Sequence, residues 1–369
     1  MQIKTITCHD VYNTGASLQA YALTAYLNHL GHEAKIIDYK PDYLSNHFSL
    51  TLVSNGRFDR PIIRQMYLAA KLPGRLKERK SERKKKFDQF RKQYLPLTKR
   101  YQSLEELKRN PPQAQLYLAG SDQIWNTTFQ NGRDAAFYLT FAPKSSVKAS
   151  YAASFATEQI EPNWQKPVKE WLKQLDFISV RESSGLRILD QLGIHGAQHV
   201  LDPVFLLDRS EWETLCGRHP GTHPYLFVYD FDRNPKVQAI AEQLAAERGL
   251  KLHTLQDLGY GDRNFAEAGP LEFLTLVRHA SVVLSNSFHA TAFSLLFERE
   301  FWVMNRQERI NARMRDLTES IGLGSRLITG AEQVTKDAID YAVVRTQLQK
   351  YINSSRAYLD LVIQEAQKI

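Results

Sequence analysis

The chain has 369 residues, of which 43% are hydrophobic and 24% charged, and its formal net charge is +8. This length exceeds what one hydrophobic core usually serves, so we expect two domains, and the composition excludes wholesale disorder. Cys8 and Cys216 lack CxxC spacing and support neither a disulfide framework nor a zinc site, and no run of about eighteen apolar residues predicts a membrane span.

The first elements in the chain predict a strand, a turn and a helix. Gln2 to Thr7 alternates like a strand, Asn13-Thr14-Gly15 is typical of a turn, and apolar residues at helical spacing run from Leu18 to Leu30. With the apolar run at 34–38 they form a βαβ unit of the kind that builds parallel sheets. We see no secretory signal at this end, so we expect a cytoplasmic protein.

The positive charge is confined to one segment. The segment from Arg75 to Arg100 contains twelve Lys or Arg and three acidic residues, a net charge of +9, so the rest of the chain is close to neutral. We interpret this segment as an exposed helix with a thin apolar seam. It predicts either a solvated helix face or a peripheral contact with anionic lipid, or with an acidic lipid-linked glycan, at the inner face of the membrane, where each Lys or Arg contributes about 1 kcal/mol.

Alternating strands and helices continue along most of the chain. We expect strands at 116–119, 147–155 and 177–180, a second series of strands and helices from Tyr225 to Met304, and a helix at 337–367. The predicted domains are an N-terminal α/β domain at 1–207 on the acceptor side, a C-terminal α/β domain at 208–335 on the donor side, and a helical segment at 336–369. Two Rossmann-like α/β halves match the GT-B arrangement, in which ligands lie between the domains.

Several familiar chemistries are excluded because their motifs are missing. The sequence contains no GxGxxG opening a helix, no GxxxxGK[ST], no HExxH and no GxSxG. Transfer chemistry without an organic cofactor or a metal remains.

Polar residues follow two predicted strands of the first domain. The turn at 13–19 can hold an anion or a sugar hydroxyl on free backbone N–H groups, or it is a plain helix cap. The loop at 120–126 combines carboxylate, amide, hydroxyl and indole groups, which suits a carbohydrate, although its indole can equally be core and its carboxylate a cap. The candidate cleft residues are Asn13, Gly15, Ser17, Gln19, Ser121, Asp122, Gln123, Trp125 and Asn126.

The segment after the predicted strand at 282–284 holds the sharpest single candidate, His289. On the first turn of a helix capped by Asn286 or Ser287, the positive end of the helix dipole favours a neutral imidazole, which can act as a base. Arg181 and Arg313 are candidate anion ligands, because guanidinium groups bind carboxylate and phosphate in bidentate fashion. Surface salt bridging is the alternative role for both.

Seven motifs resemble the polysaccharide pyruvyl transferase family, in the order of that family: NTGASLQAYAL at 13–23, GSDQIWN at 120–126, SYAASF at 150–155, SVRE at 179–182, VLDPVFLL at 200–207, SNSFHATAFS at 285–294 and NARMRDLTESIGL at 311–323. The resemblance implies a GT-B-like fold, phosphoenolpyruvate as donor, a hydroxyl pair on a lipid-linked or polymeric glycan as acceptor, and a pyruvate ketal as product.

The resemblance also assigns residues. It points to Arg181, His289 and the neighbourhood of Arg313 as donor-side positions, with Asn286 and Ser287 beside them, and to the loop at 120–126 as part of the cleft. It leaves open whether Arg313 or Arg315 is the donor ligand and whether His289 acts as acid or base. The stretch at 45–73 matches no family motif, so the acceptor sugar stays open.

Two rival functions remain. A GT-B glycosyltransferase using a nucleotide sugar would share the architecture and suit the same cleft residues. A non-catalytic basic protein would hold nucleic acid through phosphates, but charge confined to one segment argues against it, so we expect no nucleic-acid partner.

Overall fold

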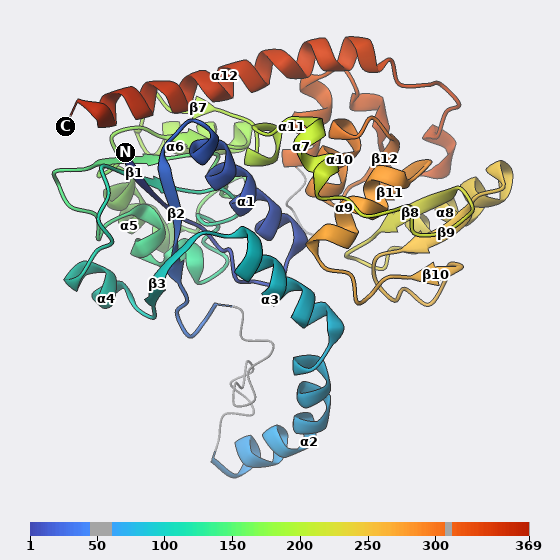
Figure 1. The fold of residues 1–369 in the computed structure, drawn as a ribbon, viewed down its shortest axis with the longest axis horizontal. Helices are drawn as coiled ribbons and strands as arrows, with labels where there is room; N and C mark the ends of the chain where they lie inside the picture. Colours follow the sequence, from blue (N-terminus) through green and yellow to red (C-terminus); the bar gives the residue numbers. More distant parts are fainter. Residues whose placement is uncertain (45–60, 307–311, 369) are drawn as a thin grey trace.

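The computed structural model describes residues 1–44, 61–306 and 312–368. Two parallel sheets, one from each half of the chain, lie side by side, and a long C-terminal helix runs along both (Figure 1). Asn311 of the last family motif and residues 45–60 of the stretch without a motif lie outside the described residues.

The first sheet has the strand order β3-β2-β1-β4-β5, and every neighbouring pair is parallel. The strand predicted to reach residue 155 ends earlier, at Ser150, because Ala152 adopts a φ of 51°, outside the region that strands occupy. The strands are β1 (Gln2–Ile6), β2 (Glu33–Tyr39), β3 (Leu97–Tyr101), β4 (Leu116–Ala119) and β5 (Val147–Ser150).

The helices of this half begin with α1, which follows the predicted turn. Asn13 caps it by accepting a hydrogen bond from the Ala16 N–H at 3.1 Å, and α1 contacts both β2 in its own half and α9 (Pro270–His279) in the other. Apart from the helices of the basic segment, described below, the other elements are α4, α5, α6 and a two-stranded sheet. Their bounds are α1 (Thr14–His29), α4 (Leu104–Arg109), α5 (Pro162–Leu172), α6 (Ser183–Gln191), β6 (Ser179–Val180) and β7 (Gln198–His199).

The second sheet has the order β10-β9-β8-β11-β12-β13 and is also parallel throughout. Its strands are β8 (Tyr225–Tyr229), β9 (Lys251–Thr254), β10 (Arg263–Asn264), β11 (Val282–Ser285), β12 (Glu300–Met304) and β13 (Leu327–Ile328). The helices of this half are α7 (Arg209–Thr214), α8 (Pro235–Arg248), α9 (Pro270–His279), α10 (Phe288–Leu296) and α11 (Ala312–Ser320).

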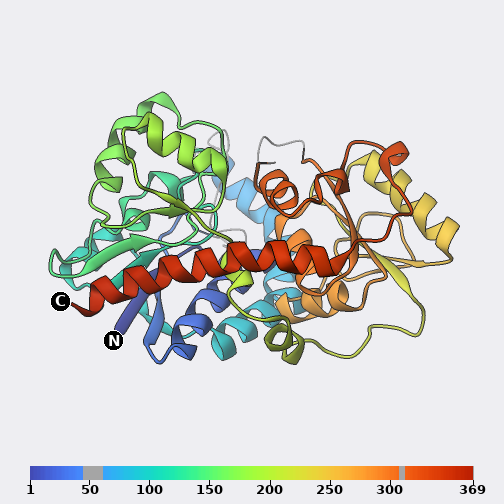
Figure 2. The same cartoon turned by 90° about the horizontal axis from the view of Figure 1, so that it is seen from above.

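The last helix, α12 (Tyr341–Gln367), starts four residues later than predicted and returns from the second half to the first (Figure 2). The Tyr358 hydroxyl donates to the Ser150 carbonyl at 2.8 Å, and Leu359 and Val362 are fully buried. Because one hydrophobic cluster includes side chains of both sheets and of α12, the two halves share part of their core.

The basic segment is not the single exposed helix that we predicted. Arg75 belongs to the end of α2 (Pro61–Arg79), Ser81 caps a new helix, α3 (Glu82–Tyr94), and the segment finishes in β3. Phe87 and Phe90 are buried, so α3 packs against the body of the protein, whereas α2 projects from it (Figure 1).

Much of the positive charge on α3 is also neutralised. Lys84 pairs with Asp88 at 2.5 Å, Lys85 with Glu82 at 2.5 Å, and Lys86 with Glu272 of α9 at 2.9 Å. The described helices include none that is long and apolar enough to cross a membrane.

Candidate active site

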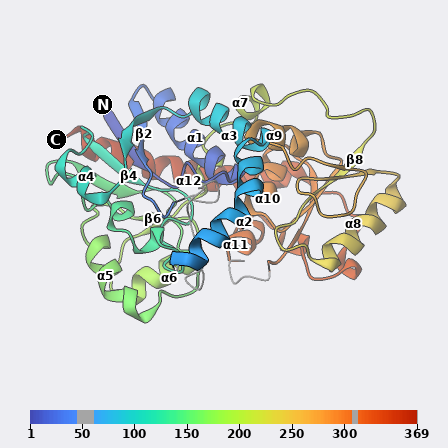
Figure 3. The same cartoon turned by 90° about the horizontal axis from the view of Figure 1, so that it is seen from below.

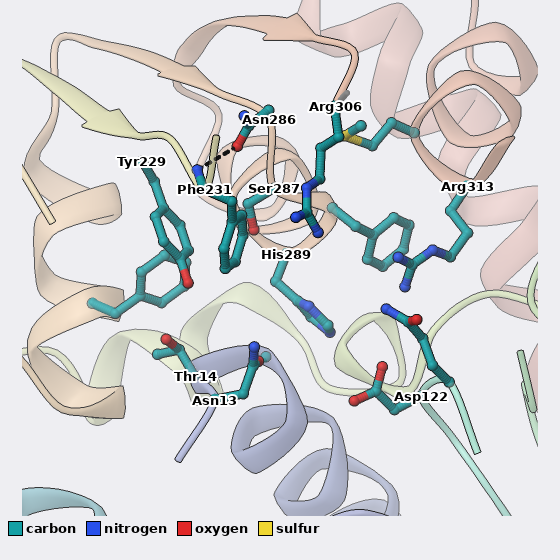
Figure 4. A pocket seen from close by; sticks show the side chains of 15 residues that line it. Asn13, Thr14, Asp122, Tyr229, Phe231, Asn286, Ser287, His289, Arg306 and Arg313 are labelled. Atoms are coloured by element: carbon teal, nitrogen blue, oxygen red, sulfur yellow. Dashed lines mark hydrogen bonds between the residues drawn. The ribbon is translucent and has the colours of Figure 1, made fainter. Parts of the chain in front are cut away.

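The carboxyl ends of both sheets meet at a pocket between the two halves (Figure 4). Loops after β1 and β4 line it from one side, and loops after β8, β11 and β12 from the other, so it lies where strand order diverges in each sheet, the usual ligand position in open α/β folds. It encloses about 640 Å³, part of which is open to solvent. Its lining residues are Asn13, Thr14, Gly15, Asp122, Gln123, Tyr229, Phe231, Phe273, Asn286, Ser287, Phe288, His289, Arg306, Arg313 and Met314.

His289 lies on the first turn of α10, as predicted. Ser287, rather than Asn286, caps this helix by accepting a hydrogen bond from the Ala290 N–H at 3.4 Å. The imidazole Nε2 is buried and lies 3.6 Å from Oδ2 of Asp202. On its other side the ring lies against Gly15, where an added Cβ would be only 1.9 Å from Nδ1.

Asp202 connects His289 to Arg181. Arg181 Nη1 donates a short hydrogen bond to Asp202 Oδ2, and both side chains are almost completely buried. Burial alone would raise the pKa of Asp202, but the charge of Arg181 and the adjacent His289 outweigh it and hold this pKa well below its usual range. The imidazole therefore faces a carboxylate that stays ionised.

Arg181 is buried behind the pocket rather than lining it. Its Nη2 lies 3.4 Å from Oδ1 of Asp122, so its guanidinium interacts with two carboxylates. Burial would lower the pKa of Arg181, but Asp202 and Asp122 outweigh burial and raise it. In this position Arg181 holds two carboxylates, and with Arg313 it lines a smaller neighbouring cavity.

Arg313 is the contrasting case. It lines the pocket with 7% of its surface exposed, and the structure gives its guanidinium no hydrogen bond or ion pair with any described residue. Burial and the nearby charge of Arg181 lower the pKa of Arg313 to about 10. Arg315, the alternative ligand, is more exposed and lies 3.7 Å from Glu158, away from the pocket lining.

The residues on the rim include several that sequence reasoning missed. Arg306 follows β12 and lies 3.3 Å from Asp232, with its guanidinium 4.8 Å from the Phe231 ring centroid. Tyr229 and Phe231 lie at and just beyond the end of β8. All three lie at or directly after the end of an apolar strand. The other candidates were chosen by that same criterion, so it could also have identified these three.

The amide of Asn286 is engaged in the protein itself. Its Oδ1 accepts from the Phe231 N–H at 2.9 Å, and its Nδ2 donates to Asp230 at 2.6 Å, so it fixes the loop after β8 (Figure 4). Asn13 also lines the pocket, but its side-chain oxygen already accepts the hydrogen bond that caps α1.

The loop at 120–126 contributes only part of its polar groups. Asp122 and Gln123 line the pocket, and Asp122 adopts a φ of 73° with its carboxylate toward Arg181, so it caps no helix. Trp125 is wholly buried, donates Nε1–H to the Phe137 carbonyl at 3.0 Å and stacks on Tyr138, which makes it core rather than a platform for sugars.

Four further candidates also lie outside the pocket lining and serve the framework. The Ser121 N–H donates to Gln19 Oε1 at 3.1 Å, tying the loop to α1. Asn126 accepts from the Thr128 N–H at 3.1 Å within its own loop. Ser17 is buried within α1. The sequence shows that these polar residues are clustered, but it does not show which of their side chains point into the pocket and which into the protein.

Comparisons with known proteins agree with this architecture. The family model of polysaccharide pyruvyl transferase matches residues 13–308. UDP-N-acetylglucosamine 2-epimerase from Rickettsia bellii matches with 12% identity and a TM-score of 0.50, covering 100% of this chain and 98% of that one. UGT89C1 from Arabidopsis thaliana matches with 11% identity and a TM-score of 0.51, covering 99% of each chain.

At such identities the solved structures show the fold alone, which is GT-B-like with two parallel sheets. No protein with a curated function matches the sequence. The family match spans most of the chain and includes the cleft residues from Asn13 to Arg306, which come from both halves, and the protein belongs to the polysaccharide pyruvyl transferase family.

Proposed function

We propose that the protein transfers a pyruvyl group from phosphoenolpyruvate to two hydroxyls of one sugar in a surface polysaccharide precursor, forming a cyclic ketal and phosphate. The observation that carries the proposal is Arg313, a buried cation that makes no ion pair with a described residue, in a cleft that also holds His289. A buried charge without such a partner is unfavourable, and an anionic donor would offset it.

The donor side of the cleft carries groups that bind anions. Phosphoenolpyruvate carries a phosphate and a carboxylate, and guanidinium groups bind both in bidentate fashion. Arg313 and Arg306 reach the cleft from the second half, and the N-terminus of α10 at Ser287 adds backbone N–H groups. We assign Arg181 to holding Asp202 and Asp122 rather than to contacting the donor.

The reaction has a definite proton balance. A proton adds to the methylene carbon of the donor, one sugar hydroxyl attacks the neighbouring carbon, phosphate leaves, and the second hydroxyl closes the ring. Each hydroxyl releases one proton; the methyl group that forms takes up one, and the departing phosphate takes up the other. One positioned group that exchanges protons therefore serves several steps.

His289 is placed to exchange those protons. The ionised Asp202 favours a proton on the buried Nε2, which leaves Nδ1, against Gly15 of the cleft lining, as the nitrogen available to substrate. The acceptor would then lie on the side of Asn13, Asp122 and Gln123, whose polar groups suit sugar hydroxyls.

The test is incubation with phosphoenolpyruvate and a candidate glycan. We expect phosphate release together with a mass gain of one pyruvate ketal on the sugar, and much less of both products from an Arg313 variant at the same concentration of phosphoenolpyruvate. A nucleotide-sugar transferase with the same fold would instead release nucleotide from a sugar donor and ignore phosphoenolpyruvate. That result would overturn the proposal.

A further inference from the structure

Helix α2 is an amphipathic helix whose apolar face is open to solvent. Met66, Leu72 and Leu76 are exposed to 70%, 40% and 39%. With Ala69 their spacings are three, three and four residues, which places them on one face of the helix. Figure 1 shows α2 extending away from both sheets, which agrees with the exposure of these side chains.

A line of basic residues runs along α2 beside its apolar face. Lys71, Arg75 and Arg79 follow one another at intervals of four residues and so form one line along the helix. Lys71, Arg79 and the following Lys80 are exposed. In the sequence of α2, Glu78 is the only acidic residue.

The base of this helix is attached next to the active-site cleft. Arg83, in the first turn of α3, donates to the Tyr12 carbonyl at 3.0 Å and to the Ala268 carbonyl at 3.1 Å, one from each half of the chain. Tyr12 directly precedes Asn13 of the cleft lining. Seen from below, α2 runs beneath the junction of the two halves (Figure 3).

We propose that α2 binds the surface of an anionic membrane, with its apolar face among the lipid headgroups and its cations against the lipid phosphates. An exposed apolar stripe beside a line of Lys and Arg suits a lipid interface, where the apolar side chains enter the headgroup region and the long cationic side chains reach the phosphates. A second copy of the chain fits less well, because pairing two α2 helices would bring two lines of like charge together. The proposal rests on the proposed function only in that such a membrane would carry a lipid-linked acceptor.

The experiment measures sedimentation of the full chain with phosphatidylcholine vesicles, alone or mixed with phosphatidylglycerol. The parent should bind the anionic vesicles, less so as salt rises. The triple variant Met66→Gln, Leu72→Gln, Leu76→Gln should weaken binding about tenfold or more, since Gln keeps helix propensity while removing the apolar face. The variant Lys71→Gln, Arg79→Gln, Lys80→Gln should weaken it at least as much and flatten the salt dependence.

Matched controls change exposed residues elsewhere. Val343→Gln with Leu361→Gln removes two exposed apolar side chains from α12, and Lys144→Gln with Lys166→Gln removes exposed charges from the first half. These variants should bind vesicles like the parent. Equal binding of the parent and the α2 triple variants would overturn the proposal.

Light scattering and an activity assay distinguish lipid binding by α2 from self-association of the chain and from the transfer reaction itself. A parent dimer that the apolar variant dissociates, without vesicle binding, would identify α2 as a self-association surface and overturn the lipid assignment. Turnover of phosphoenolpyruvate with a soluble acceptor should be unchanged in the α2 variants. If the parent shows no such turnover, the proposed function fails while the vesicle result stands.

Discussion

The imidazole of His289 occupies the space that a side chain at Gly15 would need. An added Cβ would lie 1.9 Å from Nδ1 and 2.4 Å from Cε1 of that ring. Gly15 belongs to the first turn of α1 and His289 to the first turn of α10, so this contact joins the two halves of the chain at the cleft. The position of the proposed proton-transfer group therefore depends on a residue with no side chain.

Replacing Gly15 with Ala should impair catalysis without unfolding the protein. Within α1 the change itself favours the helix by up to about 1 kcal/mol, so a loss of activity would report the displaced imidazole rather than unfolding. We expect turnover, measured as phosphate release from phosphoenolpyruvate, to fall tenfold or more, since misplacing a positioned group by about 1 Å has effects of that order.

Gly221→Ala is the matched control, because an added Cβ there meets nothing within 4 Å. It should turn over at the parent rate. Native turnover in the Gly15 variant would mean that His289 does not need its present position.

Replacing His289 with Ala should lower turnover by roughly a hundredfold or more, the usual range for loss of a positioned acid or base. Affinity for phosphoenolpyruvate, measured by calorimetry, should change less, because the donor charge is held by arginines. The control variant His195→Ala removes an exposed imidazole that does not line the pocket. It should leave turnover and the affinity for phosphoenolpyruvate unchanged. A native rate in the His289 variant would remove this residue from the mechanism.

The fold and the location of the cleft could be predicted from the sequence. Strand and helix patterns alternate clearly, and polar residues placed directly after strands collect at one edge of a parallel sheet. Among the residues that this reasoning selected, the structure brings Asn13, Asp122, Gln123 and His289 together in the lining of one pocket. It failed for Trp125, because the composition of a loop does not show which of its side chains enter the core.

The different roles of the arginines could not be predicted. Arg181 and Arg313 are both arginines close to motifs, and only the structure shows that Asp202 and Asp122 neutralise the first and no described residue pairs with the second. Likewise, the basic segment looked like one helix because its charge is continuous. Ser81 divides it, since its hydroxyl accepts from the Lys84 N–H and starts a new helix.

Replacing Asp202 with Asn should destabilise the protein, because it leaves the buried Arg181 without its closest counter-ion. Breaking a buried ion pair by removing one partner typically costs about 3 to 5 kcal/mol. We expect a loss of that order in the free energy of unfolding, measured by urea denaturation at pH 7. Asp190→Asn, at an exposed position, should change it by less than about 0.5 kcal/mol. A native denaturation midpoint for the Asp202 variant would contradict the buried pair.

The same pair predicts a pH dependence. The pKa of Asp202 is lower in the folded protein than its ordinary value of about 3.9, so its ionised form stabilises the fold above that value. This contribution should disappear as the pH falls from about 4 toward the folded pKa. Denaturation midpoints across this acid range should therefore decrease more in the parent than in the Asn variant. Parallel decreases in the two proteins would contradict the lowered pKa.

Replacing Arg313 should stabilise the protein, whereas replacing Asp202 should destabilise it. Its pKa is lowered to about 10, below its ordinary value of 12.5, so below pH 10 the ionised guanidinium destabilises the unliganded fold, and this penalty shrinks as the pH rises from 10 toward 12.5. The variant Arg313→Met keeps an apolar stem of adaptable shape and removes the charge. We expect its free energy of unfolding at pH 7 to rise by about 1 to 3 kcal/mol.

The same substitution should weaken donor binding. Loss of a charge-assisted hydrogen bond of about 1.5 to 3 kcal/mol corresponds to a roughly 10- to 150-fold weaker affinity for phosphoenolpyruvate. Thermal unfolding with and without phosphoenolpyruvate measures both effects together, since a ligand that binds only the folded state raises the melting temperature. The parent should gain stability from the ligand, whereas the variant should start higher and gain little. Arg315→Met, at the exposed neighbour paired with Glu158, should behave like the parent. A less stable Arg313 variant that still responds fully to phosphoenolpyruvate would show that its charge is neither unpaired nor the donor's partner.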